Sequence, residues 1–206
     1  MVEHVSAVAV GTVILTLLTA AGEHLLRPAG LIQALRAHRV FPAAAAVAAA
    51  VTTCEAALGV AGGYALAVGH SALLTAVLVG SAVLFTGYGS YSWHVRASAR
   101  TGSCGCSQAA PTPTTGWVVA RAFVLSGVAL SSLAVLAGAG TTLAGAAVTA
   151  FDGPRLAATL LAAATFTVLL WSLPAAMWDP SRERQGRGAG GMSSAGSQPA
   201  GLGGGR

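Results

Sequence analysis

The sequence predicts an all-α, polytopic membrane protein, built as an antiparallel four-helix transmembrane bundle plus a fifth, C-terminal span. Of the 206 residues, 54% are hydrophobic and only 8% are charged, whereas roughly a quarter of the residues of a soluble domain are charged. The mean hydropathy is +0.71, and several apolar runs reach the roughly 20 residues that a helix needs to cross a bilayer. Short polar segments separate these runs, which favours antiparallel neighbours.

The first half of the chain contains two predicted spans. The first, residues 5–22, is expected to be a retained helix, because no Lys or Arg precedes it and no convincing signal-peptide cleavage site follows. The polar connector 23–41 repeats leucines and arginines at helical spacing, which predicts a short amphipathic helix at the membrane interface. Pro42 suits the first turn of the second span, residues 42–68.

The second half contains three further predicted spans. Residues 72–93 form the third, and its last two turns carry aromatic rings of the kind found at the lipid headgroup level, namely Tyr88, Tyr91, Trp93 and His94. Residues 117–138 form the fourth span and 156–178 the fifth, while 141–151 is apolar but too short to cross a bilayer.

The chain is expected to comprise one transmembrane domain, residues 1–178, and a disordered tail, 179–206. The tail is rich in Gly, Ser, Arg and Pro, and such a segment buries too little apolar surface to offset its ordering entropy. The net charge of +5 comes entirely from arginines, since the chain has no lysine. These arginines lie mostly in loops and the tail, where they indicate membrane topology, so no nucleic-acid partner is expected.

The arginines are distributed unequally across the predicted membrane. With five spans, one side carries Arg27, Arg36, Arg39, Arg96, Arg100, Arg182, Arg184, Arg187 and Arg206, and the other side carries Arg155. The positive-inside rule places the arginine-rich side, which includes the loop between the third and fourth spans, in the cytoplasm. Stable disulfides instead belong to the oxidising outer compartment. Charge and redox chemistry therefore indicate opposite faces for this loop, and the sequence leaves the choice open.

Two of the three cysteines form the motif Cys104-Gly105-Cys106 in that loop. A disulfide between them closes a very small ring, and Gly105 relieves the backbone restriction. Strained, exposed disulfides tend to be labile or catalytic, and the arginines on either side are expected to lower the pKa of at least one thiol. Reversible redox chemistry, metal binding and an inert or palmitoylated pair all remain open. Two sulfurs alone are too few ligands for a metal, so no metal site is assigned.

An acidic residue, Glu55, lies about 13 residues into the second predicted span. A charge near mid-membrane costs at least ~2.5–3.5 kcal/mol, so Glu55 is expected to face the bundle interior and to be functional, with Arg121 as its partner. The alternative is that Glu55 only ties helices together. Its neighbour Cys54 is expected to be a small buried residue, and Gly59 and Gly63 are expected to form a close helix-packing pair.

The order of these features resembles the MauE branch of the DoxX-like membrane proteins. The resemblance covers about residues 5–138 and rests on His24-Leu25-Leu26-Arg27 after the first span, Glu55 in the second, Cys104-Gly105-Cys106 after the third, and Pro113-Thr114-Thr115-Gly116-Trp117 leading to Arg121. Family members often follow the second cysteine with Phe-Gly, whereas this chain has Ser107-Gln108.

The resemblance implies a helper role in thiol–disulfide chemistry or electron transfer at the cell membrane. The founding member of the family is needed for maturation of methylamine dehydrogenase, a disulfide-rich periplasmic enzyme. The implied site residues are Cys104, Cys106, Glu55 and Arg121. The implied partners are a dithiol or disulfide of a client protein, or another redox protein, with a membrane quinone as a candidate electron carrier. The alternative is a non-enzymatic membrane scaffold or small-solute transporter organised by a Glu55–Arg121 polar core.

Overall fold

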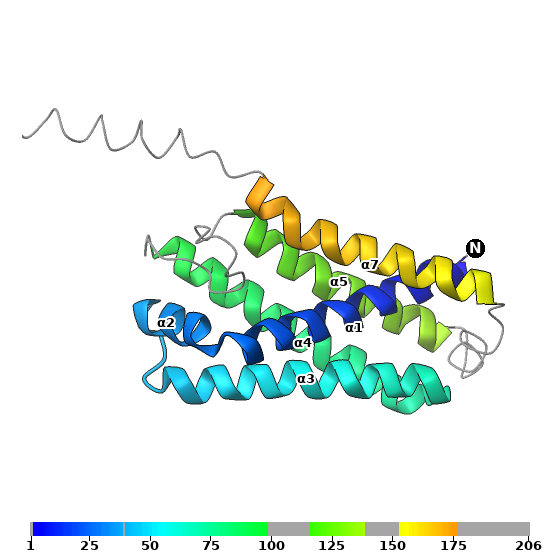
Figure 1. Ribbon diagram of the computed structural model, residues 1–206, viewed down its shortest axis with the longest axis horizontal. Helices are drawn as coiled ribbons and strands as arrows, with labels where there is room; N and C mark the ends of the chain where they lie inside the picture. The colour runs from blue at the N-terminus through cyan, green and yellow to red at the C-terminus, as the bar shows by residue number, and fades with distance from the viewer. Residues whose placement is uncertain (1, 39, 99–115, 139–152, 177–206) are drawn as a thin grey trace, which may run out of the picture. The chain divides into compact units, whose positions relative to one another are not determined.

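The computed structural model describes residues 2–38, 40–98, 116–138 and 153–176, and the regular secondary structure in these ranges is helical. The helices are α1 (Val2–Leu26), α2 (Pro28–His38), α3 (Ala44–Val68), α4 (Ser71–Ala97), α5 (Gly116–Gly138) and α7 (Gly153–Ala176) (Figure 1). The all-α prediction is thus confirmed for these residues. The Cys-Gly-Cys motif, the segment 141–151 and the tail 179–206 lie outside the described residues.

Four of the described helices, α1, α3, α4 and α5, are long and apolar enough to cross a membrane. Together they make this a multi-pass membrane protein. The apolar stretch of α7, Ala157–Ser172, is shorter, so the structure supports four spans and a shorter apolar helix near the C-terminus.

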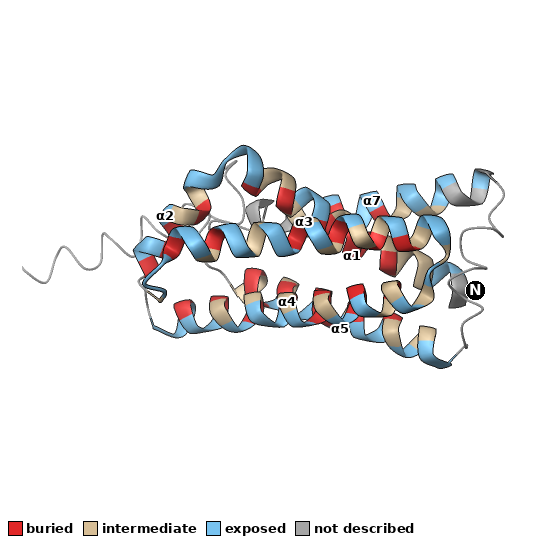
Figure 2. Cartoon of the chain, turned by 90° about the horizontal axis from the view of Figure 1, so that it is seen from below, coloured by how far each residue is buried: buried red, intermediate tan, exposed pale blue. Residues whose placement is uncertain are grey.

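The four long helices pack in a closed ring, in which α1 contacts α3, α3 contacts α4, α4 contacts α5, and α5 contacts α1. Neighbours in the ring run antiparallel (Figure 1). Val13 and Leu17 of α1, Leu78 of α4 and Ala129 of α5 form the middle of the apolar core, and the buried residues follow the inward faces of the helices (Figure 2). The arrangement is the antiparallel four-helix bundle that short connections favour.

Hydroxyl groups inside these apolar helices are satisfied locally. The Thr16 hydroxyl donates to the Thr12 carbonyl oxygen at 2.7 Å, and the Ser81 hydroxyl donates to the Val77 carbonyl oxygen at 2.7 Å. Such bonds to the preceding turn remove the cost of an unpaired polar group in an apolar surrounding. Serine and threonine therefore do not interrupt the spans.

The link between α3 and α4 is short because Gly69 and His70 each form a cap. Gly69 has φ 69° and ψ 29°, the left-handed conformation that glycine adopts without steric cost. The His70 amide donates to the Ala65 carbonyl oxygen at 2.9 Å. The His70 Nδ1 accepts a hydrogen bond from the Leu73 amide at 3.1 Å and so caps the N-terminus of α4. This turn forces α3 and α4 to be antiparallel neighbours.

The connector between the first two spans differs from the prediction. Glu23 and His24 belong to α1, which continues to Leu26. Pro28 ends α1, because a proline disfavours the helical conformation of the residue before it. The proline ring fits the first turn of a helix, so Pro28 also begins α2. The predicted amphipathic helix is therefore shorter, Pro28–His38. The next span begins at Ala44 and not at Pro42.

α2 packs back on the bundle. Leu31 and Leu35 pack with Ala44 and Ala48 of α3. The His38 Nδ1 and the Tyr91 hydroxyl of α4 are hydrogen-bonded at 2.6 Å. Tyr91 thus fastens α2 to α4, and its predicted position at the headgroup level stays a prediction.

The glycine packing pair predicted on α3 is also different. A Cβ at Gly59 would lie 2.8 Å from Leu18 Cδ2, and one at Gly62 would lie 2.9 Å from Ile14 Cγ1. A Cβ at Gly63 would meet nothing within 4 Å. The close approach of α1 to α3 thus depends on Gly59 and Gly62, and the prediction of Gly63 was wrong by one residue.

Candidate functional site

Glu55 of α3 is the most deeply buried acidic side chain among the described residues, with 1% of its surface exposed. It lies on the inward face of α3, as predicted from the high free-energy cost of exposing a carboxyl group to lipid. Cys54 is exposed on the outer face, because successive helical residues point about 100° apart. The expectation that Cys54 is buried was therefore wrong.

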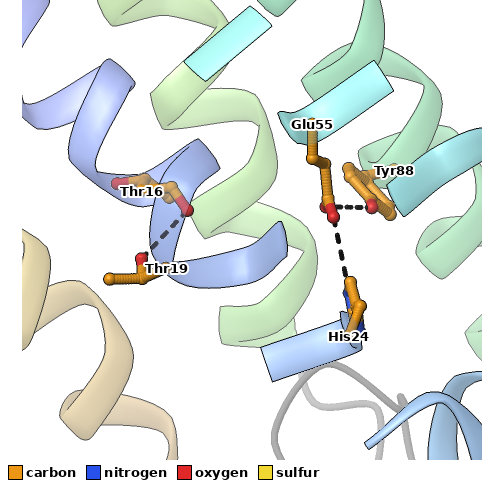
Figure 3. A network of polar contacts seen from close by, with 5 residues as sticks. All are labelled: Thr16, Thr19, His24, Glu55 and Tyr88. Carbon is orange, nitrogen blue, oxygen red and sulfur yellow. Dashed lines mark hydrogen bonds and ion pairs between the residues drawn. The ribbon is translucent and has the colours of Figure 1, made fainter. Parts of the chain in front are cut away.

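The Glu55 carboxyl group is held by residues of two other helices (Figure 3). The Tyr88 hydroxyl of α4 donates a short hydrogen bond to Glu55 Oε1. The Nε2 atom of His24, from α1, lies 3.9 Å from Glu55 Oε2, and His24 is only 5% exposed. Within the described part of the chain, Glu55 Oε2 has no hydrogen-bond partner.

A small cavity, of about 50 Å³, adjoins these three side chains. Five helices contribute to its lining, which consists of Thr16, Ala20, His24, Glu55, Phe85, Tyr88, Ser92, Val118, Arg121, Ala122, Leu125 and Trp171. Because one water molecule needs about 10–15 Å³ of such volume, the cavity has room for a few. We call it the Glu55 cavity. A carboxyl oxygen, an imidazole and a phenol around a water-sized space are groups that can bind and exchange protons.

Arg121 lines the Glu55 cavity, but its observed contacts are with α7. Its Nη1 donates to the Leu170 carbonyl oxygen at 3.2 Å, and its guanidinium carbon lies 5.3 Å from the centre of the Trp171 ring. The predicted Glu55–Arg121 pair is therefore replaced by a Glu55–His24 pair. A guanidinium stacks well on an aromatic face, so Arg121 can satisfy its charge without the carboxylate.

A second acidic side chain lies near Arg121. Glu23, one residue before His24 on α1, interacts electrostatically with both Arg27 and Arg121. Glu23 therefore places a second carboxyl group, together with Arg27, near the Arg121 side of the Glu55 cavity. No group of three or more His, Cys, Asp or Glu side chains within the described ranges is arranged to hold a metal ion.

Tyr88 was not predicted as a partner of Glu55, and no contact was predicted for His24. A signal for His24 exists, since Thr16 and His24 are eight residues apart and therefore lie within about 80° of each other around α1. A polar face in an apolar span predicts an inward orientation. Tyr88 gave no such signal, because an aromatic residue near the end of a span fits an interfacial position equally well.

The predicted site residues are brought together only in part. Glu55 and Arg121 line one cavity. Cys104 and Cys106 lie outside the described residues, so their roles stay predictions.

Comparison with known proteins identifies the family. Residues 2–137 match the family described as methylamine utilisation protein MauE. No curated protein and no solved structure matches the chain significantly. The family match covers about two thirds of the chain, including α1 to α5 and with them His24, Glu55, Tyr88 and Arg121. The chain belongs to the MauE family.

Proposed function

We propose that this protein is a membrane thiol–disulfide or electron-transfer protein that assists the redox maturation of a partner protein. Family membership implies a role in methylamine utilisation. The finer assignment rests on the Cys104-Gly105-Cys106 motif, which lies between α4 and α5 in the sequence, and on the polar site in the bundle. The wider kinship with DoxX-like proteins stays a prediction from the sequence motifs.

The observation that supports this proposal most is the position of the Glu55 cavity relative to Ser98 and Gly116. These are the described residues on either side of the segment 99–115, which contains both cysteines. Arg121 lies five residues after Gly116, and Ser92 lies six residues before Ser98. At 1.5 Å per residue, Arg121 is about 7.5 Å along α5 from Gly116, and Ser92 is about 9 Å along α4 from Ser98. The Arg96 guanidinium also lies against Gly116, so the end of α4 and the start of α5 are adjacent. A polar site with titratable groups therefore lies within about two helical turns of both Ser98 and Gly116.

In the proposed reaction, the thiolate of Cys104 or Cys106 attacks a partner disulfide and forms a mixed disulfide. The other thiolate then displaces the partner sulfur. The products are a Cys104–Cys106 disulfide and a partner dithiol, so two electrons pass to the partner. The reverse sequence oxidises a partner dithiol. A second redox protein or a membrane quinone restores the starting state of the pair.

The test is a redox titration of the purified protein in bilayer nanodiscs. The protein is equilibrated across a glutathione series, free thiols are alkylated and the mass is measured. We expect Cys104 and Cys106 to convert together between dithiol and disulfide, at a potential above the roughly −300 mV typical of structural disulfides. A Cys54→Ser variant serves as the control, because it leaves only the two loop thiols.

Two results would contradict the proposal. The first is a pair that stays reduced in oxidising buffer or stays oxidised at the glutathione poise of the cytosol. The second is a Cys104→Ser, Cys106→Ser double variant that still supports growth on methylamine. That second outcome would favour the alternative, a non-enzymatic membrane scaffold or transporter.

A further inference from the structure

His24 borders two separate spaces. On one side it lines the Glu55 cavity. On the other it lines a more open groove of about 310 Å³ between the end of α1, α2 and the first half of α3, which we call the α2 groove. The other residues of this groove are Leu25, Pro28, Leu31, Ile32, Ala45, Ala48, Ala49, Thr52 and Thr53. Glu55 lines the cavity but not the α2 groove, so His24 is the member of this pair that borders both spaces.

The geometry at His24 suits the passage of a proton. Its Nε2 faces Glu55 Oε2 at 3.9 Å, a gap that a small movement of either side chain closes to hydrogen-bonding distance. Glu55 Oε1 already accepts a hydrogen bond from Tyr88, whereas Oε2 is buried and, among the described residues, accepts none. An imidazole can take up a proton at one ring nitrogen and release one from the other, as proton-shuttling histidines do.

We propose that His24 is a proton-transfer residue that connects the α2 groove with a proton-binding site at Glu55. The imidazole takes a proton from water in the groove and gives the proton on Nε2 to Glu55 Oε2. The net change is one proton moved from the groove to the carboxylate, and the reverse transfer returns it. No oxidant or reductant is involved, so the inference does not depend on the thiol chemistry of the loop.

The titratable and charged groups around this site come from four helices. α1 contributes His24 and Glu23, α3 contributes Glu55, α4 contributes Tyr88, and α5 contributes Arg121. α7 contributes Trp171, which does not titrate, and the α2 residues that line the groove are apolar. Arg121 is engaged by α7. Within the described residues, His24 is the titratable group that lines both spaces.

The experiment is infrared difference spectroscopy of the full chain in nanodiscs, which detects the C=O stretch of protonated carboxyl groups. A pH series should show a band that is lost in Glu55→Gln. Transfer into D₂O should then shift this band, and the rate of the shift reports how fast the proton at Glu55 exchanges. The same band should persist in the Cys104→Ser, Cys106→Ser variant, which separates this inference from the proposed function.

Two variants address the route of the proton. His24→Phe removes the shuttle, and we expect the exchange to slow by about a hundredfold, the lower end of what a positioned acid–base side chain contributes. Ala49→Phe fills the α2 groove at an exposed position of α3 and should also slow the exchange. Ala57→Phe is the matched control, because Ala57 is exposed on α3 two turns further on and does not line the groove.

Three results would overturn the inference. They are the absence of a Glu55-dependent band across the pH series, an exchange rate in His24→Phe equal to that of the parent protein, and equal rates in Ala49→Phe and Ala57→Phe. If His24→Phe does not fold, the comparison of the two alanine positions decides the question alone.

Discussion

Glu55 carries a carboxyl group that neither lipid nor a dry helix interface accommodates without hydrogen bonds. The bundle supplies a phenol from α4 and an imidazole from α1, and leaves a water-sized cavity beside the remaining oxygen. Three side chains form the site, and they are far apart in the sequence. Glu55 lies 31 residues after His24 and 33 residues before Tyr88.

The first prediction concerns the carboxyl group itself. Glu55→Gln keeps the size of the side chain and an oxygen that accepts from Tyr88, so the variant should insert into the membrane normally. It removes the ability to bind and release a proton, so growth on methylamine should be impaired. Membrane fractionation and growth rates measure the two effects. Glu3→Gln, near the other end of α1, is the control, and full growth of the Glu55 variant would show that the ionisable group is dispensable.

The second prediction concerns the hydrogen bond to that group. Tyr88→Phe leaves Glu55 Oε1 buried without its donor, which should lower the free energy of unfolding by about 1–3 kcal/mol. Unfolding in mixed micelles, combined in a double-mutant cycle with Glu55→Leu, which removes the accepting oxygen, should give a coupling energy of roughly 0.5–3 kcal/mol. Strictly additive effects of the two substitutions would mean that the bond contributes nothing to stability.

At the scale of elements, pairs of helices are fixed by a few small or polar residues. α3 approaches α1 closely because Gly59 and Gly62 carry no side chain. α4 and α5 share a hydrogen bond between the hydroxyls of Thr86 and Ser126 at 2.8 Å. Without water between helices, such close contacts and polar links replace the hydrophobic effect as the source of specific association.

The third prediction compares two neighbouring glycines of α3. Gly62→Leu forces a side chain against Ile14 and Val77 and should destabilise the bundle by about 1–3 kcal/mol through overpacking. Gly63→Leu faces open space and should be neutral or slightly stabilising, because leucine has the higher helix propensity. The stability of both variants is compared by their resistance to unfolding by detergent. Equal losses at the two positions would contradict the observed packing of α1 on α3.

The fourth prediction concerns the attachment of α2. Tyr91→Phe keeps the ring that stacks on Phe41 but removes the hydroxyl bonded to His38. The loss should be about 1 kcal/mol and local. Hydrogen exchange should therefore become faster in α2 and remain unchanged in α1 and α5. Uniform acceleration across all helices would show instead that the bond supports the whole bundle.

At the scale of the whole molecule, membrane orientation follows from the first four spans alone. With four spans, one side holds the connector between α1 and α3, the last turn of α4 and the segment between α4 and α5. These stretches of the sequence contain Arg27, Arg36, Arg39, Arg96 and Arg100. The short turn at Gly69 and His70, on the other side, contains none. The positive-inside rule thus gives the same orientation whether or not α7 crosses the membrane.

The fifth prediction follows from this asymmetry. In intact cells of a Cys54→Ser variant, the loop thiols should be protected from a membrane-impermeant maleimide and should react after the membrane is opened. The test compares labelling by a membrane-impermeant and a membrane-permeant maleimide, measured by mass. Labelling in intact cells would place the loop on the oxidising side, as stable disulfide chemistry favours.

The sequence by itself determined that the protein is an all-helical membrane protein, the approximate position of each described span and the inward orientation of Glu55. These follow from hydrophobicity over about 20 residues and from the cost of a buried charge, which are properties of single segments. Only the tertiary structure decided the partners. It pairs Glu55 with His24 and Tyr88, assigns Arg121 to α7, and selects Gly62 over Gly63. These choices depend on the rotation of each helix relative to its neighbours, and one residue of rotation, about 100°, exchanges an inward position for an outward one.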